Sequence, residues 1–256
     1  MKYFILTDLE GVAGTDSFAQ TRTENRARKY SSMKQLAAEA NACIEGIRSI
    51  DSEAEVVVWD GHGSGGLDEE DLRGATYIPP QQKPYFNLSG YAAMLFVGQH
   101  AMAGTFHAPL CHTFNSRNIV YYRLNDVYVG EFAVRALVAG LQGVPTILLA
   151  GDDKAAAEAR CFIPDIELAV VKRGKGLEEA EHLSADAACS LVREASARAV
   201  SRHQEIEPFT AFAAPFILEI RYNERPSMTK WNENQAEWID DRTIRITSDS
   251  INDLPF

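Results

Sequence analysis

A series of short apolar segments, separated by longer amphipathic ones, constrains the fold of this 256-residue chain more than any other feature. Such continuous apolar runs are typical of parallel strands that are buried on both faces. The segment from Arg22 to Ile50 has apolar residues at helical spacing, which predicts a long helix after the first strand. This alternation predicts an α/β fold, a three-layer α/β/α sandwich with a mostly parallel sheet. The clearest strand segments are Tyr3–Leu6, Glu55–Asp60, Ala93–Gly98 and Pro145–Ala150. We also expect a short acidic helix at Leu67–Leu72 and a hairpin whose turn is Asn125–Asp126, between Ile119–Leu124 and Val127–Val129. His182 is expected to be solvated in helical, polar surroundings.

The pattern becomes less regular after residue 165. We expect a strand at Leu168–Lys172, a basic glycine loop to Gly176 and a helix at Ala185–His203. Two further strands are expected at Phe216–Tyr222 and Thr243–Ile246. No internal repeat or linker separates independent domains. The sequence therefore predicts one domain over residues 1–256, with a core of about 1–165 and a smaller C-terminal α+β subdomain of about 166–256.

Composition and charge exclude several classes of partner. The net charge is −11, and no long run of Lys or Arg compensates for it, so we expect no nucleic-acid partner. The basic residues between Arg22 and Lys29 are interrupted by Glu24 and are interpreted as a solvated helix face. No apolar run is long enough to span a bilayer, so we expect no membrane partner. The N-terminus has no charged lead or cleavage site before its first strand, so we expect no signal peptide and a cytoplasmic protein.

Ionisable side chains stand where consecutive predicted strands end. Open α/β sheets bind ligands at the carboxyl ends of their strands, so these side chains are expected to meet at one edge. Two imidazoles and three carboxylates suit zinc, manganese or cobalt, and they suit two ions better than one because five ligands exceed a tetrahedral shell. The candidate metal ligands are Asp8, Glu10, His62, His100 and Glu131.

Each of these residues, taken singly, also has an ordinary structural interpretation. Asp8 and Glu10 are compatible with a turn that caps a helix, and a histidine after a strand is often a hydrogen-bonded loop residue. Glu131 is favourable in any first helical turn. Asp60 is either a partner that orients a ligand histidine or a turn residue at the end of its strand. The coincidence of three strand ends favours the metal site.

The phrases TDLEG, VVWDGHG, VGQHAM, CHT, VGEFAVRALVAG and VPTILLAGDD occur in this order over most of residues 1–200. Together they resemble the D-aminopeptidases of the dipeptide-transport-operon type, the DppA-like zinc metallopeptidases. The resemblance implies zinc ligands at Asp8, Glu10, His62, His100 and Glu131, and an active-site residue at His112. It further implies a homo-oligomer, a decamer of two stacked rings with active sites facing an inner chamber.

The function predicted from these residues is metal-dependent hydrolysis of short peptides, with an N-terminal D-amino acid as the family implies. Two zinc ions would activate water, and His112 would serve as general base, although the family designates this residue a nucleophile. A two-metal phosphoesterase or another amidohydrolase on the same ligands is the alternative. A third possibility is that the metal only stabilises the fold and takes no part in catalysis. Lys172, Arg173 and Lys175 form either a solvated loop or a site for a substrate carboxylate.

Overall fold

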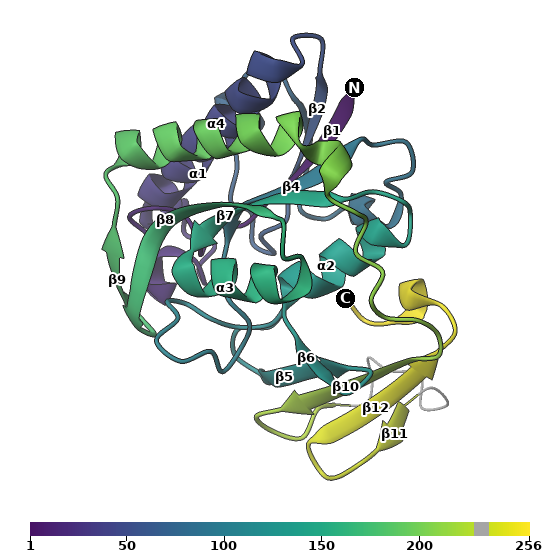
Figure 1. Ribbon diagram of the computed structural model, residues 1–256. Helices are drawn as coiled ribbons and strands as arrows, with labels where there is room; N and C mark the ends of the chain where they lie inside the picture. The colour runs from purple at the N-terminus through teal and green to yellow at the C-terminus, as the bar shows by residue number, and fades with distance from the viewer. Residues whose placement is uncertain (228–235) are drawn as a thin grey trace.

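The computed structural model describes residues 1–227 and 236–256, and two β-sheets organise them (Figure 1). The strands of the larger sheet are β1 (Lys2–Thr7), β2 (Glu55–Asp60), β3 (Thr76–Ile78), β4 (Ala93–Gln99), β7 (Thr146–Asp152), β8 (Glu167–Gly176) and β9 (Glu179–His182). Their order is β3-β2-β1-β4-β7-β8-β9. All neighbouring pairs from β3 to β8 are parallel, and β9 is antiparallel to β8. The predicted mostly parallel sheet is confirmed.

Helices cover both faces of this sheet. The helices α1 (Arg26–Ile50) and α4 (Ala185–Ser201) pack side by side on one face, and α2 (Glu131–Gly140) and α3 (Asp153–Phe162) lie on the other (Figure 1). The central strands are apolar and almost completely buried between these layers, as residues Phe4, Leu95 and Leu148 illustrate. The three-layer sandwich predicted from the sequence is therefore confirmed.

A smaller antiparallel sheet lies beside the sandwich (Figure 1). Its strands are β5 (Ile119–Leu124), β6 (Val127–Val129), β10 (Phe216–Tyr222), β11 (Ala236–Trp238) and β12 (Thr243–Ser248). The predicted hairpin is present, because Asn125 and Asp126 both have the positive φ that its turn needs. The order of strands is β11-β12-β10-β5-β6, so the hairpin pairs with the C-terminal strand β10.

Sheet membership does not divide the chain at residue 165 as the sequence predicted. The strands β8 and β9 and the helix α4 extend the larger sheet and its helical layer, although they follow residue 165. The hairpin β5–β6 precedes that residue but joins the smaller sheet. Periodicity gives each element's type, whereas the partner of a strand depends on contacts between distant segments.

Other differences from the expected elements are local. The long helix begins at Arg26 rather than Arg22, because Asn25 caps it through a bond from the Ala27 N–H. The expected glycine loop at 172–176 is the second half of β8, and β9 and β11 were not predicted. The expected short helix at 67–72 is one 3-10 turn. The 3-10 turns are Phe18–Gln20, Glu69–Asp71, Pro84–Phe86, His203–Glu205 and Ile251–Asp253.

The order of the larger sheet reverses direction between β1 and β4. From β1 the chain adds β2 and then β3 on one side, and it later adds β4 and β7 on the other side. Open parallel sheets bind ligands at the carboxyl ends of strands at such a reversal point. Among the helices that the structure describes, none is long and apolar enough to cross a lipid bilayer.

Candidate metal centre

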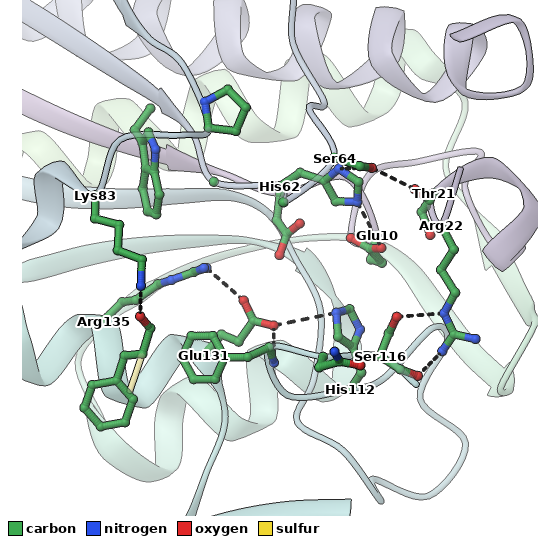
Figure 2. A pocket seen from close by; sticks show the side chains of 18 of the residues that line it. Glu10, Thr21, Arg22, His62, Ser64, Lys83, His112, Ser116, Glu131 and Arg135 are labelled. Carbon is green, nitrogen blue, oxygen red and sulfur yellow. Dashed lines mark hydrogen bonds and ion pairs between the residues drawn. The ribbon is translucent and has the colours of Figure 1, made fainter. Parts of the chain in front are cut away.

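The six side chains singled out in the sequence meet at this reversal point. In the register of the sheet, Thr7 of β1 lies opposite Asp60 of β2 and Val97 of β4, so the three strands end side by side. Figure 2 shows the Glu10, His62, His112 and Glu131 side chains converging on one space. All six residues are buried or largely buried: Asp8, Glu10, His62, His100, His112 and Glu131.

Three histidine Nε2 atoms face carboxylate oxygens in this cluster. His62 Nε2 lies 3.4 Å from Glu10 Oε1. His100 Nε2 lies 3.4 Å from Asp8 Oδ2 and 3.5 Å from Glu131 Oε1. His112 Nε2 lies 3.6 Å from the same Glu131 oxygen. Glu131 reaches the cluster from the first turn of α2, while the other residues follow strands.

The distances and the free atoms fit a metal site. Two ligand atoms at about 2.0–2.1 Å from a tetrahedral zinc ion are about 3.3 Å apart, close to the separations seen here. His100 Nε2 and Glu10 Oε2 are completely buried and have no hydrogen-bond partner in the part of the chain that the structure describes. His100 Nδ1 lies 2.9 Å from the Ala101 carbonyl and donates to it, which leaves the Nε2 lone pair free for a metal. The residues present therefore fit zinc.

The carboxylates of the cluster favour a positive charge at its centre. Burial and the neighbouring Glu10 carboxylate both raise the pKa of Asp8. Burial opposes the charge on His62, but the Glu10 carboxylate dominates and raises the pKa of His62 to about 9. Burial likewise opposes the charge on Glu131, yet Arg135 and His100 hold the pKa of this carboxyl well below its ordinary value. A bound cation would supply the charge that protons on histidine otherwise provide.

His112 differs from the other histidines of the cluster. Burial, assisted by the charge on His100, lowers the pKa of His112 below its ordinary value of 6.5. Its Nδ1 lies 2.9 Å from the Leu110 carbonyl and donates to it, so Nε2 carries the free lone pair. The ring stacks on that of His100 with centroids 4.0 Å apart. His112 is therefore a neutral base whose accepting nitrogen faces the cluster.

The loops that carry these residues are fixed by close backbone contacts. Gly98, with φ of 81°, allows β4 to approach the loop after β1, because a Cβ there would lie 1.9 Å from the Asp8 carbonyl oxygen. Asp60 accepts bonds from the N–H groups of Gly66 and Leu67 at 2.8 and 3.1 Å, and a longer one of 3.3 Å from His62. Asp60 thus shapes the loop of His62 through the backbone.

Two buried ionisable residues bind the backbone of the loop after β1. The Lys172 ammonium is buried and donates to the carbonyl oxygens of Glu10 and Thr15. Burial lowers the pKa of Lys172 to about 8. Glu39 of α1 accepts a bond from the Ala13 N–H at 2.9 Å, and burial raises its pKa to about 7. The expectation of a solvated or substrate-binding Lys172 was therefore wrong.

A cavity of about 440 Å³ opens over the cluster and carries basic side chains at its walls. The acidic and histidine side chains form its floor, and Trp59, Tyr85 and Phe114 contribute apolar wall. The sequence pattern did not indicate the basic wall, because these residues come from four separate segments. They are Arg22, Lys83, Arg117 and Arg135.

Arg22 and Lys29 do not form the solvated face expected from the sequence. Arg22 lies before the helix and lines the cavity, where Figure 2 shows it beside Ser116. Lys29 is buried and donates to the carbonyl oxygens of Ser64 and Gly65 at 2.8 and 2.6 Å, which fixes the loop of His62. His182 was expected to be solvated in a helix, but it lies on β9 and accepts a bond from the Gly14 N–H at 2.9 Å.

Comparison with known proteins agrees with the geometry. A protein-family model described as D-aminopeptidase matches residues 1–255. The D-aminopeptidase of Bacillus subtilis (strain 168) is 32% identical over 247 residues, which cover 93% of this chain and 84% of that protein. A solved structure of the "Zn-dependent D-aminopeptidase DppA from Bacillus subtilis, a self-compartmentalizing protease" has a TM-score of 0.87 and 27% identity, over 98% of this chain and 93% of that chain. The family predicted from the sequence is confirmed, and the chain belongs to the D-aminopeptidase family.

Proposed function

We propose that the protein is a zinc-dependent aminopeptidase that hydrolyses short peptides with an N-terminal D-amino acid. The observation that carries the proposal is the buried cluster in which two imidazole–carboxylate groups meet beside a free histidine base. The family membership and the zinc dependence of the solved relative support the same chemistry.

Two ions would share this cluster. The ligands that would hold them are Asp8, Glu10, His62, His100 and Glu131. Asp8, Glu10 and His100 form one group of possible ligand atoms, and His100 and Glu131 belong to a second group with His112. Zinc bound by these residues would supply an acidified water and polarise the carbonyl of the scissile amide.

The chain's own residues move the proton. His112 is neutral, so its Nε2 can take a proton from the attacking water and return it to the departing amine. The bond from Nδ1 to the Leu110 carbonyl keeps the ring in the tautomer that this transfer needs. His112 Nε2 lies 3.6 Å from one Glu131 oxygen, and Arg135 pairs with the other Glu131 oxygen at 3.0 Å. The acidic floor suits the α-ammonium group of a peptide substrate.

We also propose that the chain assembles into a homo-oligomer, a decamer of two stacked rings. The support is its similarity to a solved protease described as self-compartmentalizing. Sedimentation equilibrium would give the mass of ten chains, and a monomer at micromolar concentration would contradict the proposal. Zinc as the metal used in the cell and a cytoplasmic location stay predictions.

A substrate panel tests the proposed function. Purified protein is assayed with D- and L-aminoacyl-p-nitroanilides and with p-nitrophenyl phosphate, each with added zinc or manganese. Aminopeptidase activity that favours the D-aminoacyl substrates is expected. Turnover of p-nitrophenyl phosphate alone would instead identify a phosphoesterase, which the same ligands would also suit.

A further inference from the structure

Two of the four basic residues on the cavity wall bind other groups of the protein. The Lys83 ammonium donates to the carbonyl oxygen of Phe256. The Arg135 guanidinium pairs with Glu131 at 3.0 Å and lies among the rings of Trp59 and Tyr85. These two residues support the metal cluster and the wall. Figure 2 shows Arg22 across the cavity from Lys83, and neither Arg22 nor Arg117, which also lines the cavity, is used by the proposed mechanism.

Arg22 is held rigidly in place. Its guanidinium stacks on the Phe18 ring at 3.2 Å from the ring centre. Its Nε donates to Ser116 Oγ at 2.8 Å, and one terminal nitrogen donates to the Ser116 carbonyl oxygen. Figure 2 shows this guanidinium at the edge of the cavity, beyond Glu10 and His112. The remaining terminal N–H groups have no partner among the described residues, so they are free to bind a ligand.

Arg117 stands next to this contact on a fixed loop. The Asn115 side chain accepts bonds from the N–H groups of Arg117 and Asn118, both at 3.0 Å, and so folds the loop into a turn. Asn223 of the smaller sheet's neighbouring loop donates to the Arg117 carbonyl at 2.7 Å. At the start of the loop, the Phe114 N–H donates to Glu131 at 2.8 Å. One short segment thus connects the metal cluster to Arg117.

Arg22 and Arg117 line the same cavity and carry like charges. Burial lowers the pKa of Arg22, and the charge of Arg117 lowers it further. Among the described residues the Arg117 side chain has no ion pair, and the Glu178 carboxylate near Arg22 accepts bonds from Ser17 and Phe18 instead. Glu10, the other acid near Arg22, lies in the proposed metal cluster. A bound anion would relieve the repulsion.

We infer that Arg22 and Arg117 bind the C-terminal carboxylate of a short peptide whose N-terminus lies at the metal cluster. This inference rests on the proposed function and names the part of the substrate that the opposite end of the cavity recognises. Guanidinium groups suit a carboxylate because their N–H donors match its two oxygens. A peptide bound at both charged ends must be short, so the pair selects dipeptides and tripeptides over longer chains and over C-terminal amides.

The test compares one dipeptide with its own C-terminal amide. Alanyl-alanine of the configuration chosen by the substrate panel, and the same dipeptide amide, are assayed with wild type, Arg117→Gln and Arg22→Gln. Arg160→Gln, on the exposed end of α3, is the matched control. Wild type is expected to have a higher kcat/KM for the free acid. Each cavity variant is expected to lower the acid-to-amide ratio at least about tenfold, mainly through KM, because a charge-assisted bond is lost.

The binding step is measured separately from catalysis. In a His112→Ala background, the free dipeptide is expected to raise the melting temperature more than its amide does, and Arg117→Gln is expected to remove that difference. A wild-type enzyme that does not distinguish acid from amide in either assay would overturn the inference. The same holds for an Arg117→Gln ratio that matches the control. If neither substrate is hydrolysed, the proposed function fails, while the melting-temperature comparison still decides the carboxylate site.

Discussion

The buried carboxyl group of Glu39 leads to a quantitative prediction about pH and stability. Glu39 lies completely buried on α1 and accepts bonds from Ala13 and Gln35, both at 2.9 Å, while its second oxygen has no partner among residues 1–227 and 236–256. Burial raises its pKa from the ordinary 4.5 to about 7. The folded protein therefore binds a proton at Glu39 more tightly than the unfolded chain does, so stability falls as the pH rises through this window.

The size of the effect follows from the shift. Each pKa unit corresponds to about 1.4 kcal/mol, so the free energy of unfolding loses about 3.4 kcal/mol over the whole window. Integrating the two titrations places about 2.5 kcal/mol of this loss between about pH 5 and pH 8. Glu39→Gln keeps the shape and the accepting oxygen but cannot ionise. The variant should therefore gain about 2.5 kcal/mol relative to wild type between these two pH values.

Urea unfolding of both proteins at about pH 5 and pH 8, at equal protein and zinc concentrations, measures this difference. Titrating groups that do not interact with Glu39, including the buried Glu158, occur in both proteins and cancel in the comparison. Lys172 interacts with Glu39, so a Lys172→Met background removes its contribution from both proteins. At any one pH, the change in the free energy of unfolding also includes a constant cost, because the substitution introduces an amide N–H donor. This cost does not depend on pH. A variant-minus-wild-type difference that is equal at the two pH values would refute the reasoning about Glu39.

Two further predictions concern the loop of His62 and the catalytic base. A Cβ at position 61 would lie 2.7 Å from the Thr7 carbonyl oxygen, whereas position 63 has no atom within 4 Å. Gly61→Ala should therefore displace His62 and lower zinc affinity at least about tenfold, while Gly63→Ala should retain the wild-type zinc affinity. Equal zinc affinities of the two variants would contradict this. Because the pKa of His112 is lowered and the base must be neutral, the acidic limb of kcat should lie below pH 6.5 while zinc remains bound. A limb above pH 6.5 at full zinc content would exclude His112 as the base.

The sequence predicted that the five proposed ligands lie near one edge of the sheet, because four of them stand where strands end. Continuous apolar runs identified β1, β2 and β4, and the carboxyl ends of parallel strands meet at one edge. His112 was not found by that logic, since it lies in an irregular loop after Leu110; only the resemblance to the family singled it out. The structure explains its position by the stack on His100.

What the sequence did not reveal depends on contacts between distant segments. Lys172 stands in a basic, glycine-containing segment that is typical of a solvated loop. Its burial accompanies the folding of the loop after β1, where its ammonium donates to the carbonyls of Glu10 and Thr15. The basic cavity wall depends on distant contacts in the same way, because Arg22 bonds to Ser116, the neighbour of Arg117 in the sequence.

The strand pairing of the smaller sheet could not be predicted from the sequence for the same reason. The hairpin of β5 and β6 was expected from its own turn residues, but its pairing with β10 joins Leu124 to Leu218 across the chain. Local periodicity carries no information about such a partner. The predicted division near residue 165 therefore followed the change in pattern rather than the membership of the sheets.

Metal content and activity, measured together in three proteins, test the central claim most directly. Wild type should bind two zinc ions per chain and hydrolyse the aminoacyl substrate. Asp8→Ala should lose zinc and activity because it removes a proposed metal ligand, whereas His112→Ala should keep both ions and lose at least about a hundredfold in kcat. An active His112→Ala enzyme, or an Asp8→Ala protein that retains full zinc, would contradict the account.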